Sequence, residues 1–97
     1  MSPNNKKKLL ILRKNLDNID NKLLNLLKIR ANHVKKVLSL KEYKKEIVDK
    51  KRINTILKNI KIKSIKKDID PKISHRIWKS MIYAFIDYEF RNFKKKK

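Results

Sequence analysis

The stretch that decides the fold is LLILRKNLDNIDNKLLNLLKIRANHVKKVLSLKEYK, which spans residues 9–44. Its apolar residues recur at intervals of three and four, the period of one face of an α-helix. They are Leu9, Leu12, Leu16, Ile19, Leu23, Leu26, Leu27, Val34, Val37 and Leu40. Because the stretch contains no Gly or Pro, it predicts one helix about 50 Å long. The residues that follow are too few to cover so long a face, so we expect a second copy of the chain to cover it.

Two cations, Arg30 and Lys41, interrupt the apolar stripe. The helix is expected to run to about Tyr43 or Lys44. The spacing of about three full turns then places Arg30 and Lys41 on one face, with Cα atoms about 16 Å apart. Their side chains then leave a gap that suits a small dianion. Arg13 lies about 25 Å before Arg30 and about 100° around the helix axis. It cannot serve the same ligand in the same chain, but an antiparallel partner helix could carry it there.

Composition predicts one all-α domain over residues 1–97, with frayed ends at 1–6 and 94–97. The chain has no Cys, which excludes disulfides and Cys-type zinc sites. Its two histidines, His33 and His75, are too far apart for a convincing metal set. The absence of Gly argues against phosphate-binding loops and most tight hairpins. We therefore expect helices with short connections, and no metal or cofactor.

The formal net charge of +20 raises the alternative of a basic helical dimer that binds nucleic acid. The charge is spread over all segments, and the sequence is rich in Lys, Asn and Ile, which indicates a general bias in amino-acid usage. Only five of the 29 basic residues are Arg, whose planar fork suits carboxylates. They are Arg13, Arg30, Arg52, Arg76 and Arg91. Either these arginines are kept to bind carboxylates, or they only reflect the low arginine content of a lysine-rich sequence. Nucleic-acid binding is the weaker functional alternative.

No membrane or targeting segment is expected. The basic N-terminus is followed by the apolar run Leu9–Leu12, which breaks at Arg13. Four apolar residues are too few for a signal-peptide core or a membrane span. The chain reads as cytoplasmic.

Two further helices are predicted after a polar connection. Asp49 is typical of an N-cap, and the helix after it carries apolar residues inward until about Lys63. Asp70-Pro71 predicts the start of a third helix that ends near Phe93. Its inward set is Ile73, Ile77, Trp78, Met81, Ile82, Phe85, Ile86 and Phe90. Glu89 lies on this stripe, either at its edge with a lysine partner or as a site acid facing the cations of the first helix.

Three segments resemble the all-helical chorismate mutases and the related isochorismate–pyruvate lyases. Residues 12–20 read LRKNLDNID, residues 23–30 read LLNLLKIR and residues 37–41 read VLSLK. They are similar, in order and spacing, to the family's L-R-x-x-I-D-x-I-D, L-L-x-L-L-x-x-R and V-x-x-x-K. Asp49, Arg52 and Glu89 follow at matching places, so the resemblance covers about residues 9–93.

The resemblance implies a three-helix chain whose long first helices pair in an intertwined homodimer with two sites. Arg13 from the partner would join Arg30 and Arg52 in binding the substrate's two carboxylates. Lys41 would meet the ether oxygen, with Glu89 on its other side. The remaining substrate-binding positions would be Asp49, Ile53 and Phe85. The implied reaction is the rearrangement of chorismate to prephenate in aromatic amino-acid biosynthesis.

Three positions depart from the pattern of many mutases. Glu89 stands where they have Gln, and a carboxylate cannot donate a hydrogen bond to the ether oxygen. Glu89 would therefore act protonated, with activity that improves toward acid pH. Ile53 replaces a Glu that contacts the ring hydroxyl, and Phe85 replaces a small polar residue. Both replacements resemble the lyases, so isochorismate–pyruvate lyase activity, which forms salicylate, stays open as an alternative.

Overall fold

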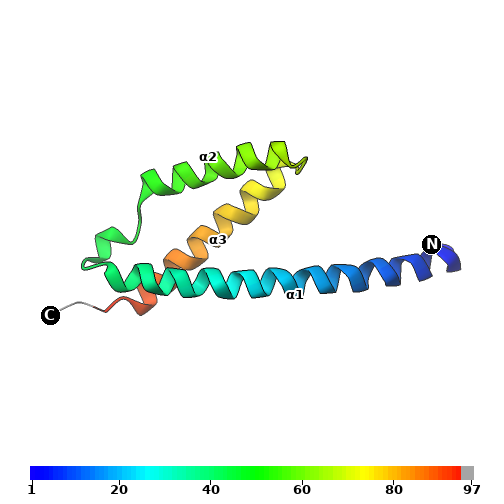
Figure 1. Cartoon of the computed structure of the whole chain (residues 1–97), viewed down its shortest axis with the longest axis horizontal. Coiled ribbons are helices and arrows are strands. Elements are labelled where there is room, and N and C mark those ends of the chain that lie inside the picture. Colours follow the sequence, from blue (N-terminus) through cyan, green and yellow to red (C-terminus); the bar gives the residue numbers. More distant parts are fainter. Residues whose placement is uncertain (95–97) are drawn as a thin grey trace. The chain divides into compact units, whose positions relative to one another are not determined.

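The computed structural model describes residues 1–94 and is built from helices (Figure 1). These are α1 (Pro3–Leu40), the short 3-10 helix η1 (Lys44–Glu46), α2 (Lys50–Lys66) and α3 (Pro71–Asn92). No strand occurs within residues 1–94, so the predicted all-α class with a long first helix is confirmed. The chain divides into two compact units, residues 1–33 and residues 34–97. Lys95–Lys97, predicted to fray together with Lys94, lie outside the described residues.

Helix α1 begins earlier than predicted. The hydroxyl Oγ of Ser2 accepts a hydrogen bond from the backbone N–H of Asn5 at 3.2 Å, and Pro3 occupies the first helical position. An N-cap serine followed by proline both satisfies and pre-shapes a helix start. The polar sequence from Met1 to about Asn5 suggests instead a lead-in before the helix. That expectation was wrong, because Ser2-Pro3 is a start signal of the same kind as Asp70-Pro71.

Helix α1 also ends earlier, at Leu40 instead of residue 43 or 44. Ser39 Oγ donates to the carbonyl oxygen of Lys36 at 2.6 Å, and the N–H of Lys41 bonds to the carbonyl of Leu38, only three residues back. Such local bonds compete with the helical ladder. Lys41 therefore lies just beyond the helix. The prediction that it shares one helix face with Arg30 assumed helical geometry at residue 41 and does not apply.

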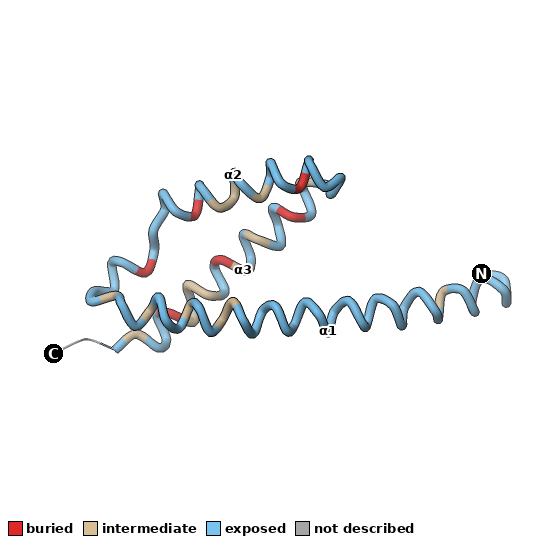
Figure 2. The backbone as a smooth tube through the Cα atoms, viewed as in Figure 1, coloured by how far each residue is buried: buried red, intermediate tan, exposed pale blue. Residues whose placement is uncertain are grey.

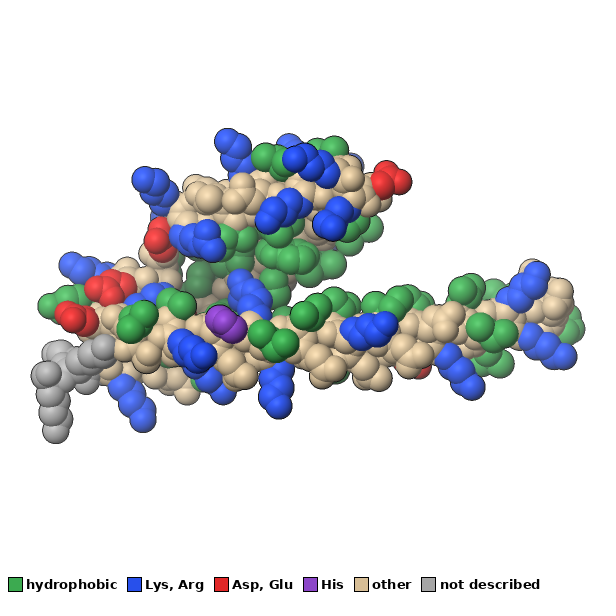
Figure 3. All heavy atoms as spheres, in the orientation of Figure 1, with side chains coloured by type: hydrophobic (Ala, Val, Ile, Leu, Met, Phe, Trp, Pro, Cys, Tyr) green, Lys and Arg blue, Asp and Glu red, His purple; other side chains and the backbone are tan. Residues whose placement is uncertain are grey.

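The apolar stripe of α1 lies at the surface of the single chain. No residue of α1 is buried (Figure 2), and Leu12, Leu16 and Leu23 are each more than half exposed. The green side chains along α1 in Figure 3 show this exposed stripe. A helix with a regular apolar face in water is the pattern of an element that packs against something else.

Both predicted caps of the later helices are confirmed. Asp49 Oδ1 accepts from the N–H of Arg52 at 2.9 Å, and Asp70 Oδ1 accepts from the N–H of Lys72 at 2.9 Å. Helix α2 runs three residues beyond its predicted end at Lys63. The turn that follows places Asp68 at φ 58°, in the left-handed region. In a chain without Gly, Asp is one of the residues that tolerate this conformation.

Helices α2 and α3 pack against each other in residues 34–97. At the end nearest their turn, Ser64 Oγ donates to the carbonyl of Ile60 at 2.6 Å, and the hydroxyls of Ser64 and Ser74 lie in hydrogen-bond contact at 2.6 Å. These two small buried side chains allow the two helices to approach closely. The buried apolar residues of the described chain are Ile47, Ile53 and Ile82.

The predicted inward face of α3 is only partly covered. Ile82 is buried, and Trp78, Met81, Phe85 and Ile86 are half-buried. The prediction was wrong for three residues that the single chain leaves exposed, which are Ile73, Ile77 and Phe90. Periodicity marks the apolar side of a helix, but one neighbouring helix covers only part of so wide a stripe.

Candidate active site

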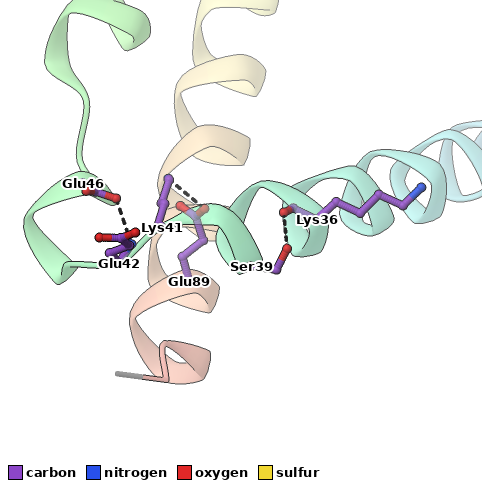
Figure 4. Close-up of polar contacts among 6 residues, drawn as sticks. All are labelled: Lys36, Ser39, Lys41, Glu42, Glu46 and Glu89. Atoms are coloured by element: carbon purple, nitrogen blue, oxygen red, sulfur yellow. Dashed lines mark hydrogen bonds and ion pairs between the residues drawn. The ribbon is translucent and has the colours of Figure 1, made fainter. Parts of the chain in front are cut away.

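The centre of the candidate site is a contact between Lys41 and Glu89, 48 residues apart in the sequence. Lys41 Nζ donates to Glu89 Oε1 at 3.0 Å (Figure 4). The Lys41 side chain is 18% exposed and that of Glu89 is 7% exposed. An ammonium–carboxylate hydrogen bond of this length is charge-assisted and stronger than a neutral one. The structure therefore brings together the two residues that the family resemblance would place on either side of an ether oxygen.

Burial makes this pair unusual among the charges of the described chain. A second ion pair, Arg91 with Asp87, lies one turn apart on α3, and both of its side chains are more than 60% exposed. A buried charge is costly unless it is paired, so Glu89 depends on Lys41 far more than Asp87 depends on Arg91. Glu89 has a lysine partner, as the first interpretation expected, but it is buried and not at an exposed edge. That lysine is Lys41, one of the two cations that the second interpretation had it face.

The segment that carries Lys41 is held by local contacts. The N–H of Glu42 donates to Glu46 Oε2 at 3.0 Å, which closes the turn around η1 (Figure 4). The next residue, Ile47, is buried and anchors the segment in the unit formed by residues 34–97. Sequence reasoning missed this turn, although Glu46, six residues after the end of α1 and four after Glu42, was a usable signal. The result is a lysine presented by a fixed turn and a glutamate presented by the last turns of α3.

Asp49, Arg52 and Ile53 lie together at the start of α2. The carboxylate of Asp49 is occupied as the helix cap, while the side chains of Asp49 and Arg52 remain exposed. Ile53 is buried, with 8% exposure. Phe85, one turn before Glu89 on α3, is half-buried. The site positions of this unit thus include an exposed arginine and two apolar side chains that are covered to different degrees.

Arg13 and Arg30 belong to the other unit, residues 1–33. Arg13 lies on the exposed N-terminal half of α1, and Arg30 is half-buried. Six of the eight candidate residues therefore fall within residues 34–97, and these are Lys41, Asp49, Arg52, Ile53, Phe85 and Glu89.

Within residues 1–94, no group of three or more His, Asp or Glu side chains is placed to hold a metal. No helix in the same range combines the length and apolar character needed to cross a membrane. What the site offers instead is cationic and acidic hydrogen-bonding groups.

Comparison with known protein families identifies the group to which this arrangement belongs. A family model described as chorismate mutase type II matches residues 12–90. The chain belongs to this family. The matched range contains all eight candidate residues, from Arg13 to Glu89, and the resemblance seen in the sequence is confirmed at the level of the family, which is one of isomerases. Searches of curated proteins and of solved structures found no match.

Proposed function

We propose that this chorismate mutase type II protein is a cytoplasmic enzyme that converts chorismate to prephenate in aromatic amino-acid biosynthesis. Family membership supports an isomerase, and the buried Lys41–Glu89 contact supports this particular reaction. The rearrangement is unimolecular: one carbon–oxygen bond of the ether breaks while one carbon–carbon bond forms. It requires no nucleophile, and the enzyme must fold the enolpyruvyl arm over the ring and stabilise negative charge on the ether oxygen.

Lys41 is the group that meets this charge in our proposal. Its ammonium is already oriented by Glu89 and is largely withdrawn from water. A donor that is fixed before the reaction pays no reorganisation cost as charge develops, and this is the main way in which such sites accelerate a reaction. The arginines hold the two carboxylates and so contribute orientation.

Glu89 has a second role in the proposal. As a carboxylate it accepts from Lys41 and cannot donate to the ether. The family resemblance places Glu89 across the ether oxygen from Lys41. This role requires the 3.0 Å contact between the two side chains to open and Glu89 to donate an O–H to that oxygen.

The carboxylate-binding set in this proposal is completed by a homodimer, with Arg30 and Arg52 from one chain and Arg13 from its partner. Large apolar side chains of α1 are exposed in the single chain, among them Leu12, Leu16 and Leu23. The exposed stripe of α1 is the face that we propose the partner covers.

Isochorismate–pyruvate lyase activity is the alternative, because Ile53 is apolar and buried where many mutases carry an acid. Turnover of chorismate and of isochorismate, measured side by side, separates the two. We expect prephenate from chorismate at the higher kcat/KM. Pyruvate and salicylate from isochorismate at the higher kcat/KM would instead assign the chain to the lyases. If the protein turned over neither substrate, the enzyme proposal would fail and the nucleic-acid alternative would be the next to test.

A further inference from the structure

A second concave site lies between α2 and α3, apart from the candidate active site. This groove has a volume of about 740 Å³ and an apolar floor that includes Leu57 and Pro71. Its other lining residues are Lys58 and Lys61 of α2 and Lys72, His75 and Arg76 of α3. We refer to it as the α2–α3 groove. Its size is within the usual range of small-molecule sites, about 300–1,000 Å³.

The groove combines an apolar wall with a cationic rim. The methylene stems of lysine and arginine extend an apolar surface while their charged ends reach toward water. Four of the lining residues carry a positive charge, and none of the lining residues is acidic. The nearest acid in the sequence, Asp70, already accepts the N–H of Lys72 as the cap of α3. The blue side chains around α2 in Figure 3 show how strongly basic this helix is.

The groove and the candidate active site share no residue, although Leu57 of the groove follows Ile53 of the site by one turn of α2. Arg76 and Glu89 lie on the same helix, thirteen residues apart, which is about 20 Å along its axis. A small ligand in the groove therefore does not touch Lys41 or Glu89. This inference does not depend on the proposed reaction.

We propose that the α2–α3 groove binds a small organic anion, with a carboxylate or phosphate group on an apolar body about the size of one or two aromatic rings. The apolar body would cover Leu57 and Pro71, and the anionic group would meet Arg76 and the lysines of the rim. The apolar floor argues against a nucleic-acid backbone, whose charged phosphates would leave that floor uncovered. The planar fork of Arg76 suits a carboxylate or phosphate group.

The test uses 2-naphthoate as the probe and the histidine ring signals of the full-length protein in NMR spectra. The chain has two histidines. His75 lines the groove, whereas His33 lies on α1 and serves as the internal control. We expect saturable shifts of the His75 signals with little change at His33. The neutral analogue 2-naphthalenemethanol and inorganic phosphate should each bind more weakly than 2-naphthoate.

Matched variants complete the test. Arg76→Gln should weaken 2-naphthoate binding roughly tenfold, the effect of losing one charge-assisted hydrogen bond. Lys66→Gln removes the same charge from α2 at a position that does not line the groove, and should leave the affinity unchanged. Both residues are exposed, so both variants should keep the far-UV circular dichroism of the parent.

Three results would overturn the proposal. Equal loss of affinity in Arg76→Gln and Lys66→Gln would mean that the probe responds only to overall charge. Equal binding of inorganic phosphate or of the neutral analogue would remove the need for a site that is both apolar and cationic. Loss of the His75 shifts in Lys41→Met would place the probe in the candidate active site. A failure of chorismate turnover leaves these readouts unaffected, so the two proposals fail separately.

Discussion

Lys41 Nζ lies 3.0 Å from Glu89 Oε1, and the two side chains bury each other between the end of α1 and the last turns of α3. The chain has 29 basic and nine acidic residues. This contact gives one of those acids, Glu89, an environment of its own. Most of the chain's charged side chains are exposed to water. Glu89 instead has a fixed partner that our proposal also places at the reacting oxygen.

Replacing Glu89 with Gln should change the pH profile. Glutamine is always a donor, whereas glutamate donates only when protonated. We therefore expect Glu89→Gln to keep more of its activity toward high pH than the parent does, when both are assayed from about pH 5 to about pH 8. The measurement is kcat/KM for chorismate across this range. Identical profiles for the two proteins would show that Glu89 does not donate to the ether.

Breaking the Lys41–Glu89 pair from one side should destabilise the fold. Lys41→Met leaves the carboxylate of Glu89 buried without its partner, at a cost of about 3 kcal/mol. Adding Glu89→Leu to that variant removes the stranded carboxylate and should restore most of the loss. Urea denaturation of the two single variants and the double variant completes a cycle. If the losses of unfolding free energy in the two single variants add up to the loss in the double variant, the Lys41–Glu89 contact itself does not stabilise the fold.

The proposal that Arg13 acts in the site of the partner chain can be tested by mixing two inactive variants. Arg13→Ala and Arg52→Ala should each lose most activity as homodimers. After they are unfolded together and refolded as an equal mixture, half of the dimers are hybrids with one intact site each. We then expect about a quarter of the parent activity. No recovery, with hybrid dimers shown to form, would mean that both arginines act within one chain.

Asp49 has two possible roles, which two substitutions separate. Its Oδ1 caps α2, so Asp49→Ala should cost about 1 kcal/mol of stability. Asp49→Asn keeps a capping oxygen and should be nearly as stable as the parent. If Asp49 also contacts substrate, as the family resemblance suggests, Asp49→Asn should raise KM at unchanged stability. A parent-like KM in the Asn variant would leave the carboxylate with its capping role alone.

The helix starts were largely predictable from the sequence, because capping signals are local. Asp49 and Asp70-Pro71 cap α2 and α3 as predicted. Ser2-Pro3 carried the same kind of signal and was overlooked. The end of α1 was harder to predict, since neither Gly nor Pro marks it. It depends on the hydroxyl of Ser39 and on a turn closed by Glu46.

The candidate site was predictable in its residue types and less so in its packing. Lys41 was identified as a cation on the apolar face, but its helical placement was wrong because α1 ends one residue earlier. The burial of Glu89 could not be predicted from periodicity, which marks a stripe without showing how deeply each residue is covered. Ile73 and Ile77 illustrate the converse, since they belong to the same stripe and remain exposed in the single chain.

The most direct test of the central claim is the conversion of chorismate to prephenate by the parent protein and by two lysine variants. Lys41→Met removes the donor that we place at the ether oxygen, and Lys66→Met removes an exposed lysine of α2 as a matched control. We predict prephenate formation by the parent and by Lys66→Met, and a fall of kcat by at least about a hundredfold in Lys41→Met that remains folded. Parent-like kcat in folded Lys41→Met, or no prephenate from the parent, would contradict the account.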